Sequence, residues 1–397
     1  MLLKGYFKGY KQGFISFVFI ALALFSLTTV AERPYFAQRP AKANIPDHLL
    51  EAFANRFQNA RHVKKAIDAN RRHAAALFNS TGVIGSGVGW AEGNQAVVKL
   101  YLEASASSAG LPAFVDGIPV VIERTGTIYA LNVGCGQNNS CEPDNNVEAT
   151  TGSEPALQTD WHERPVPIGT SVSRAYGYEA GTLACRVSGG CHAYALSNAH
   201  VFAGRDLSTP VGTNVLQPGR YDGGTNPDDA IGMLYKSIPI VIGTDPYFVD
   251  NRVDAAIAET TSSMVGVATR SDGYGTPRME PLAPAAGLNV MKYGRTTGLT
   301  YGYIEAIDVM INVAYDDLGE QVALFKGQFI IRGNGGTSFS SSGDSGSLVV
   351  ASGGADDRRP VGLIFAAGLD SNNAPISVAN NIEDVLTLLE VSIDGDL

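Results

Sequence analysis

The sequence predicts a mainly β protein in which a small α+β region precedes a larger part built of short strands. Glycine is abundant, with 45 residues, and together with Asn and Asp it separates short runs rich in Val, Ile and Tyr. Such runs are typical of strands joined by turns rather than of helix bundles. Apolar residues recur at helical spacing from Leu50 to Ile67, which places the main helix near the N-terminus.

Composition and charge limit the class of partner. Hydrophobic residues make up 45% of the chain and charged residues 17%, and 397 residues give room for two or three domains. The net charge at pH 7 is −10, so the protein does not attract the phosphate backbone of nucleic acids. A nucleic-acid partner is therefore not expected.

Residues 1–31 resemble a secretory signal peptide. Three lysines at positions 4, 8 and 11 precede an apolar run over residues 14–30, and residues 29–31, at the end of this run, offer small residues for cleavage. The run is slightly short of a membrane-spanning helix, so an uncleaved anchor is the alternative. Both readings predict export, either to the periplasm or medium or as an outward-facing, membrane-anchored protein.

The four cysteines form two close pairs, Cys135 with Cys141 and Cys185 with Cys191. Export exposes them to oxidising conditions, so both pairs are expected as disulfides. Local pairing is the simplest of three connectivities, with residues 186–190 forming a hairpin turn. A zinc site is the alternative, but neither the spacing nor a histidine cluster supports it. No metal or cofactor is expected.

The region 45–131 is predicted to be a small α+β domain. A helix is expected from Asp47 to about Phe78, and strands are expected at 83–90, 96–103 and 118–123. Residues 132–165 are rich in Asn, Asp, Glu, Thr and Pro, and they contain the first cysteine pair. We interpret them as a linker that marks a domain boundary.

The part from 166 to 397 is predicted to be a β-barrel or β-sandwich domain that ends in a short helix at 382–389. Its expected strands are short and apolar, and Gly, Asn and Asp punctuate them: 181–187, 192–197, 230–234, 253–258, 289–293, 301–306, 309–315, 327–332, 347–351 and 361–367. The Asp-rich loop 222–229 lacks the alternating ligands of a calcium site.

The best candidate nucleophile is Ser345, in the string Gly343-Asp344-Ser345-Gly346 before an apolar run. Flanking glycines let the backbone bend sharply and bring amide N–H groups close to a reacting atom. A serine hydroxyl needs a base to take its proton and donors for the oxyanion. The backbone N–H groups of Gly343 and Ser345 are candidates for those donors.

Two upstream residues complete a candidate triad. His200 follows an apolar strand and lies in a polar turn, and Asp254 opens an apolar run that favours burial. A buried carboxylate must be paired, and a histidine N–H would satisfy it. Other candidates lack a comparable setting: His162, His192, Asp228, Asp229 and Asp250.

These residues, in the order His200, Asp254, Ser345, resemble the triad of trypsin-like (chymotrypsin-fold) serine peptidases. Residues 293–302, which include Gly294-Arg295-Thr296-Thr297-Gly298, resemble a hairpin of the α-lytic and streptogrisin-type bacterial branch. Over its whole length the chain is similar to a bacterial group that includes plant Narrow-leaf-type trypsin-like proteins. The resemblance implies two β-barrels with the site between them.

The resemblance also implies roles. Ser345 would attack the scissile carbonyl, His200 would act as general base and acid, and Asp254 would orient the imidazole. Animal members pair the aspartate before the nucleophile with a cleaved N-terminal ammonium, but no such activation sequence is present here. Arg295 is therefore the predicted ion-pair partner of Asp344. Residues 365–368 differ from the Ser-Trp-Gly of the animal branch, so the substrate specificity of the animal members cannot be assigned to this chain.

The expected function is that of a secreted serine endopeptidase acting on protein or peptide substrates. Two alternatives remain: a catalytically silent peptidase fold that serves as a binding module, and an esterase that uses the same triad. The role of the region before 166 and the oligomeric state are left open.

Overall fold

The computed structural model describes residues 47–91, 95–131, 133–134 and 157–397. The chain divides into two compact units, Met1–Phe53 and Ala54–Leu397, and only the start of one helix is described in the first. The predicted signal peptide lies outside the described residues, as do Cys135 and Cys141. Among the described helices, none is both long and apolar enough to cross a membrane.

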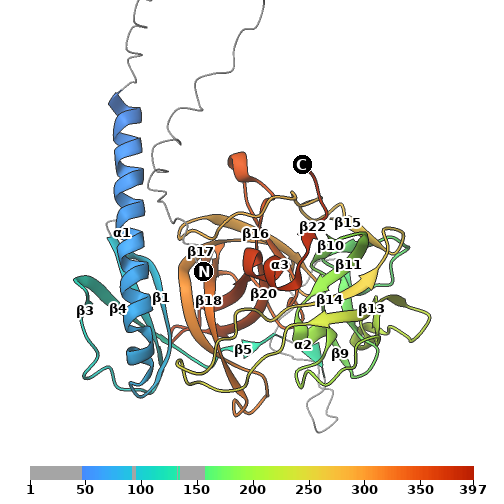
Figure 1. Ribbon diagram of the computed structural model, residues 1–397, viewed down its shortest axis with the longest axis horizontal. Coiled ribbons are helices and arrows are strands. Elements are labelled where there is room, and N and C mark those ends of the chain that lie inside the picture. Colours follow the sequence, from blue (N-terminus) through green and yellow to red (C-terminus); the bar gives the residue numbers. More distant parts are fainter. Residues whose placement is uncertain (1–46, 92–94, 132, 135–156) are drawn as a thin grey trace, which may run out of the picture. The chain divides into compact units, whose positions relative to one another are not determined.

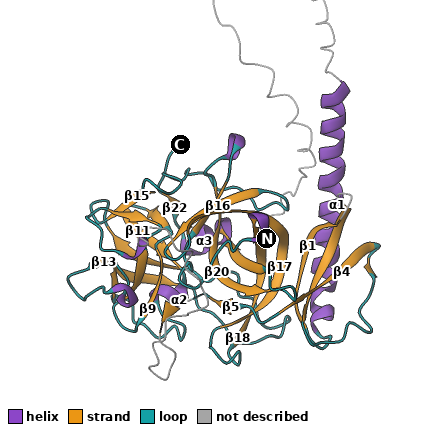
Figure 2. Ribbon diagram, turned by 180° about the vertical axis from the view of Figure 1, so that it is seen from behind, coloured by secondary structure: helices purple, strands orange, loops and turns teal. Residues whose placement is uncertain are grey.

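The mainly β class is confirmed, and most strands fall into two groups (Figure 2). The first sheet has nine strands, in the spatial order β22 (Ser392–Ile393), β10 (Cys185–Gly189), β11 (His192–Ser197), β14 (Ala256–Thr260), β13 (Ala230–Ser237), β12 (Asn214–Leu216), β8 (Ser171–Arg174), β9 (Glu179–Thr182) and β6 (Val133–Gly134).

The second sheet has eleven strands and contains a closed barrel. Its order is β16 (Asn289–Gly294), β19 (Leu348–Ala351), β20 (Pro360–Leu369), β21 (Pro375–Asn381), β18 (Val322–Gly333), β17 (Gly298–Ala314), β1 (Val83–Ala91), β2 (Gln95–Glu103), β4 (Ile118–Thr125) and β3 (Phe114–Val115), and β5 (Tyr129–Ala130) pairs with β17 and β20 off this path. An additional pairing of β16 with β17 closes six of these strands into a ring.

The two sheets repeat one strand order. In the second barrel the ring runs β16-β17-β18-β21-β20-β19, and in the first it runs β8-β9, then β10-β11-β14-β13-β12 and back to β8. β9 and β10 act as two halves of one strand, interrupted at residues 183–184. The predicted two-barrel architecture is therefore confirmed.

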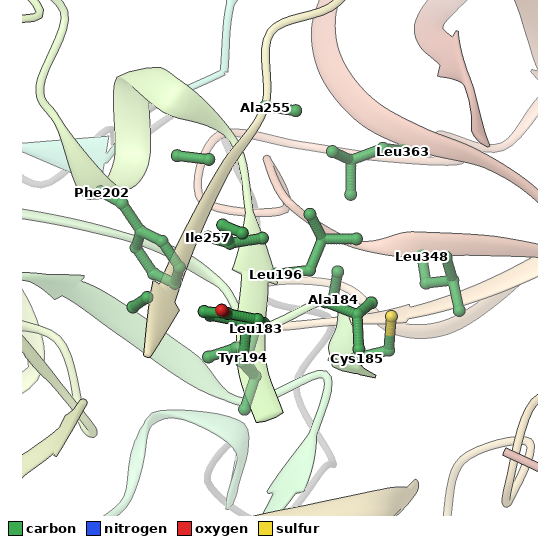
Figure 3. Close-up of a cluster of buried hydrophobic side chains, with 14 of the residues drawn as sticks. Leu183, Ala184, Cys185, Tyr194, Leu196, Phe202, Ala255, Ile257, Leu348 and Leu363 are labelled. Atoms are coloured by element: carbon green, nitrogen blue, oxygen red, sulfur yellow. The ribbon is translucent and has the colours of Figure 1, made fainter. Parts of the chain in front are cut away.

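One apolar core spans both barrels. Leu183, Leu196 and Phe202 of the first barrel share a buried cluster with Leu348 and Leu363 of the second (Figure 3). Because these side chains are removed from water together, the two barrels cannot separate without exposing the cluster. This shared core holds the elements that carry the site.

The predicted N-terminal helix is confirmed as α1 (Asp47–Phe78). Its buried residues follow one another at steps of three, one, four and three positions and form one face: Ala66, Ala69, Asn70, Ala74 and Leu77. This face packs near Val98, Leu100 and Val115 of the adjoining strands, and Asn70 Nδ2 donates to the carbonyl oxygen of Asp308 at 2.9 Å. Figure 1 shows α1 beside β1, β3 and β4.

The structure joins the two parts that the sequence separates at residues 132–165. β1 is hydrogen-bonded to β17, with Gly85 opposite Ile311 and Gly89 opposite Ala306. Lys99 of β2 bonds Glu305 of β17 at 2.8 Å, and Arg332 of β18 pairs with both Glu305 and Glu123 of β4. The N-terminal strands therefore extend the second barrel's own sheet.

The remaining elements are short. β7 (Val166–Ile168) and β15 (Val265–Thr269) form a separate parallel pair. The helices are α2 (Ala199–Phe202) and α3 (Ile382–Leu389), with single 3-10 turns at Leu157–Thr159, Arg220–Asp222, Asn334–Gly336 and Gly354–Asp356. The C-terminal helix has the predicted bounds, and the Asn381 side chain caps it by accepting from the Glu383 N–H.

The predicted disulfide between Cys185 and Cys191 is wrong, because both are free thiols in the structure. Cys185 lies opposite Leu196 and Gly189 lies opposite His192, so Cys191 is in the turn. Four residues of strand span ~13 Å at ~3.3 Å each, whereas a disulfide needs Cα atoms within ~7 Å. Spacing in the sequence did not reveal that the turn is only two residues long.

Candidate active site

His200 lies on α2, the short helix that follows β11, and its side chain is fully buried. Its Nδ1 is 2.5 Å from Asp254 Oδ2, and its backbone N–H donates to Asp254 Oδ1 at 3.1 Å. This pair of contacts fixes the ring orientation and leaves Nε2 directed away from the carboxylate.

Asp254 is held from several elements. It precedes β14, which begins at Ala256 rather than at the predicted residue 253. Its backbone N–H donates to Asn380 Oδ1 at 2.7 Å, and Asn198 Nδ2 donates to its carbonyl oxygen at 2.7 Å. The Tyr315 hydroxyl donates to Asp254 Oδ2 at 2.6 Å. Both carboxylate oxygens are therefore satisfied without water.

Two opposing effects act on the pKa of Asp254. Burial by itself raises this pKa, but the charge of His200 and the hydrogen bonds from His200 and Tyr315 outweigh it and leave the pKa below 3.8. Burial, aided by the Asp254 charge, raises the pKa of the Tyr315 hydroxyl well above its ordinary value. Tyr315 therefore stays protonated and donates to the carboxylate.

Ser345 lies in the loop between β18 and β19, where Gly343 and Gly346 have φ angles of +92° and +91°. A Cβ at Gly346 would come within 2.2 Å of both Thr182 O and Ser197 Oγ, so only glycine fits. The Thr182 N–H donates to the Ser345 carbonyl oxygen at 2.7 Å. This bond ties the serine loop to β9 of the first barrel.

Among the described residues no hydrogen bond joins Ser345 to His200, and each of the two side chains contacts a main-chain carbonyl oxygen instead. Ser345 Oγ donates to the carbonyl oxygen of Phe365 on β20 at 3.2 Å, and the Leu131 N–H donates to the same oxygen at 3.0 Å. His200 Nε2 is 3.4 Å from the carbonyl oxygen of Leu131. Residue 131 of the chain itself therefore contacts the site.

The predicted oxyanion donors are in the serine loop. The Gly343 carbonyl accepts from Thr182 Oγ1 at 2.9 Å, and the Asp344 N–H donates to the Ser341 carbonyl at 2.9 Å. Within the described part of the chain, the N–H groups of Gly343 and Ser345 have no hydrogen-bond acceptor. Both N–H groups are thus free to donate to another acceptor.

The predicted ion pair between Arg295 and Asp344 is wrong. The cation nearest Asp344 is Lys292 of β16, whose Nζ is 3.5 Å from Asp344 Oδ2, and both side chains are fully buried. Asp344 also accepts from Thr296 N at 2.9 Å, Thr297 Oγ1 at 2.6 Å and Ser341 N at 2.9 Å. This arrangement needs no cleaved N-terminal ammonium.

Burial lowers the pKa of Lys292, and the Asp344 charge opposes this shift. The Lys292 ammonium is also bonded to Thr297 Oγ1 and to the Gly298 carbonyl at 2.9 Å. These acceptors stabilise the charged form inside the barrel.

Arg295 bonds Asp222 instead, through Nε at 2.9 Å and Nη2 at 2.5 Å. Its guanidinium also lies over the Tyr221 ring, 5.3 Å from the ring centroid. Asp222 belongs to a 3-10 turn in the first-barrel region and also accepts from Ser171 Oγ at 2.5 Å. Arg295 therefore links the second-barrel hairpin to the first barrel.

Three residues of the site were missed by the sequence reasoning: Lys292, Tyr315 and Asn380. A lysine within the apolar strand 289–293 is a detectable signal, because a buried lysine requires an anionic partner. Tyr315 and Asn380 carry no comparable signal, since their partners lie far away in the sequence. The weaker candidates have other partners, with His192 bonded to Glu259 and Asp250 paired with Lys326.

The two barrels and the His, Asp and Ser residues between them define the trypsin-like class of chymotrypsin-fold proteins, as the sequence resemblance implies. More narrowly, residues 238–391 match the model of the Nal1 C-terminal domain. A search among curated proteins gives no match.

Several solved serine protease structures are similar. Thermobifida fusca protease A is 16% identical, and the match covers 58% of this chain and 98% of that one, with a TM-score of 0.40. A glutamic acid-specific serine protease is 18% identical over 58% of this chain and 100% of that one, with a TM-score of 0.41. An α-lytic protease homologue, N4, is 15% identical over 58% and 99%, with a TM-score of 0.40.

Proposed function

We propose that the protein is an exported serine endopeptidase that hydrolyses peptide bonds through Ser345, His200 and Asp254. The observation that carries the proposal is the fully buried His200–Asp254 pair at 2.5 Å, together with a buried serine on a glycine-flanked loop. A buried, fixed imidazole whose Nε2 faces the site is what activation of a serine hydroxyl requires.

The proposed reaction begins when Ser345 Oγ leaves the Phe365 carbonyl and turns toward His200 Nε2. Nε2 takes the hydroxyl proton as Oγ forms a bond to the substrate carbonyl carbon, and the N–H groups of Gly343 and Ser345 bind the oxyanion. The C–N bond then breaks, and Nε2 gives its proton to the leaving amine. Water repeats the sequence on the acyl-enzyme and releases a carboxylic acid.

Asp254 serves this cycle by stabilising the imidazolium that forms when His200 holds the proton. Its lowered pKa supports this role, because the carboxylate stays ionised at neutral pH. The features of the described residues do not favour the silent binding module or the esterase over a peptidase. Export is supported by the apolar, lysine-preceded N-terminal sequence.

Labelling with a fluorophosphonate, read by peptide mass spectrometry, tests the proposal. We expect an adduct on Ser345 that is absent in Ser345→Ala and His200→Ala but present in Ser342→Ala, the matched loop control. Since residue 131 contacts the site, the same labelling is done in Leu131→Asp. Lack of an adduct on Ser345 in both the natural protein and Leu131→Asp would refute an activated nucleophile.

A further inference from the structure

The segment 125–131 runs along the edge of β20 as an added antiparallel strand. Thr125 bridges to Asp370, and the Gly126 N–H donates to the Leu369 carbonyl at 2.8 Å. β5 then places Tyr129 opposite Ala367 and Ala130 opposite Ala366. The Leu131 N–H donates to Phe365, the residue whose carbonyl also accepts from Ser345 Oγ.

Beyond residue 131 the chain reaches the first barrel. β6 pairs with β9, with Val133 opposite Ala180 and Gly134 opposite Glu179. β9 ends at Thr182, whose N–H bonds the Ser345 carbonyl. The described residues before 132 are thus paired with the second barrel, and residues 133–134 are paired with the first barrel.

Leu131 is the residue of this segment that contacts His200 and shares a hydrogen-bond acceptor with Ser345. Its carbonyl oxygen is the group 3.4 Å from His200 Nε2, and its N–H shares the Phe365 acceptor with the serine hydroxyl. A peptide bound for attack by Ser345 must place the residue before the scissile bond at these groups. Leu131 therefore occupies the position of that residue.

The surroundings of the segment's side chains indicate which kind of side chain fits at the position of Leu131. Leu131 is 7% exposed and shares a buried cluster with Phe339 and Ile364, against which Ala367 also packs. Ala130 and Ile128 are buried in a neighbouring cluster, whereas Tyr129 is 38% exposed. A charged side chain in place of Leu131 would be desolvated among apolar neighbours.

Close approach of the backbone supports a site formed for an extended peptide. A Cβ at Gly368 would come within 2.6 Å of Ile128 Cδ1 and 2.9 Å of Thr127 O, so β20 carries a glycine where the added strand lies against it. The added strand is bonded through main-chain groups, as in peptide recognition by strand addition.

From this geometry, and resting on the proposed function, we propose a substrate class. The enzyme cleaves extended peptides after a leucine-sized apolar residue, and residues 128–131 of its own chain occupy that site until a substrate displaces them. Main-chain pairing with β20 supplies binding, and the apolar surroundings of Leu131 supply the selection.

Peptides of the series acetyl-Ile-Tyr-Ala-Xaa with a fluorogenic amide, in which Xaa is Leu, Lys or Glu, test the selection. We expect kcat/KM for Leu to exceed that for Lys and for Glu by at least about tenfold. In the full-length protein, Leu131→Asp should raise kcat/KM for the Leu peptide about tenfold or more, because a buried carboxylate expels the strand. The matched control Tyr129→Ser changes an exposed side chain of the same strand and should leave kcat/KM near the natural value.

A protein labelled on Ser345 that prefers Lys or Glu, or that is not activated by Leu131→Asp, overturns this inference and leaves the proposed function standing. Circular dichroism of Leu131→Asp confirms that the variant is folded. Should it be unfolded, Leu131→Ser replaces it, with activation again the required result. A protein that neither takes the probe nor cleaves any peptide overturns both proposals.

Discussion

Two fully buried aspartates lie on opposite sides of the site and have different partners. Asp254, in the first-barrel region, is bonded to His200, the general base of the proposed mechanism. Asp344, in the second barrel, lies beside the Lys292 ammonium and accepts hydrogen bonds from three backbone N–H groups and one hydroxyl. In the proposed mechanism one carboxylate serves proton transfer, whereas the hydrogen bonds of the other hold the serine loop in place.

The largest expected effect comes from Asp254→Asn. A neutral amide of the same shape cannot stabilise the imidazolium and favours the wrong imidazole tautomer, so kcat/KM should fall about 10⁴-fold. Kinetics with the Leu peptide measure this loss, and thermal unfolding is expected to show a folded protein. A loss smaller than tenfold would contradict a catalytic task for Asp254.

Lys292→Met should act on stability. It leaves the Asp344 charge buried without its cation, which is expected to lower the free energy of unfolding by about 3–5 kcal/mol. The double variant Lys292→Met with Asp344→Asn removes both charges and should recover much of that loss. Urea denaturation gives both values, and a double variant as unstable as the single one would show that the charge pair is not the cause.

Arg295→Ala tests whether Lys292 is the one cation that stabilises the buried Asp344 carboxylate. Because Arg295 bonds Asp222, its loss should cost about 2 kcal/mol of unfolding free energy, the scale of a charge-assisted hydrogen bond. The triad and the oxyanion loop should remain, so the folded variant is expected to keep its kcat. Abolished turnover in a folded Arg295→Ala protein would indicate that Arg295 supports the oxyanion loop after all. Arg295→Lys is the conservative control.

The smallest expected effect is the pH dependence of stability that Asp254 contributes. Its pKa is lowered in the folded protein, so its stabilising contribution is present above the ordinary value of 3.8 and is lost as pH falls through the folded value. The difference in unfolding free energy between the natural protein and Asp254→Asn should therefore shrink with acidification from pH 7 to about 3. Urea titrations at several pH values check this. A difference that grows on acidification would contradict a lowered pKa of Asp254 in the folded protein.

The parts of the fold that the sequence predicts are those with local signals. The helix expected at 47–78, the strand at 192–197 and the helix at 382–389 each follow from periodicity and turn residues, and the structure has them. The strand expected at 309–315 continues from 298 as one element, because Asp308, with φ +51°, bends the strand without ending the pairing. Local sequence does not distinguish such a bend from a turn.

Pairings between distant residues were harder to predict. Arg295 and Asp222 are 73 positions apart, and nothing in either neighbourhood distinguishes Asp222 from Asp344 as a partner. The docking of residues 129–131 on β20 rests on two paired positions and on main-chain bonds that any sequence can form. Ser345, in contrast, was predictable because glycines on both sides reflect a backbone constraint that the sequence records.

The short connection between β4 and β5 has a kinetic consequence. β4 ends at Thr125 and β5 begins at Tyr129, so the strand on β20 is tethered a few residues from a firmly paired element. A tether of this length gives an effective concentration in the millimolar range. Dilution of the protein does not free the site, because the competing residues 128–131 belong to the same chain as the site. Free peptides would meet a raised apparent KM, and long substrates with many main-chain contacts would compete best.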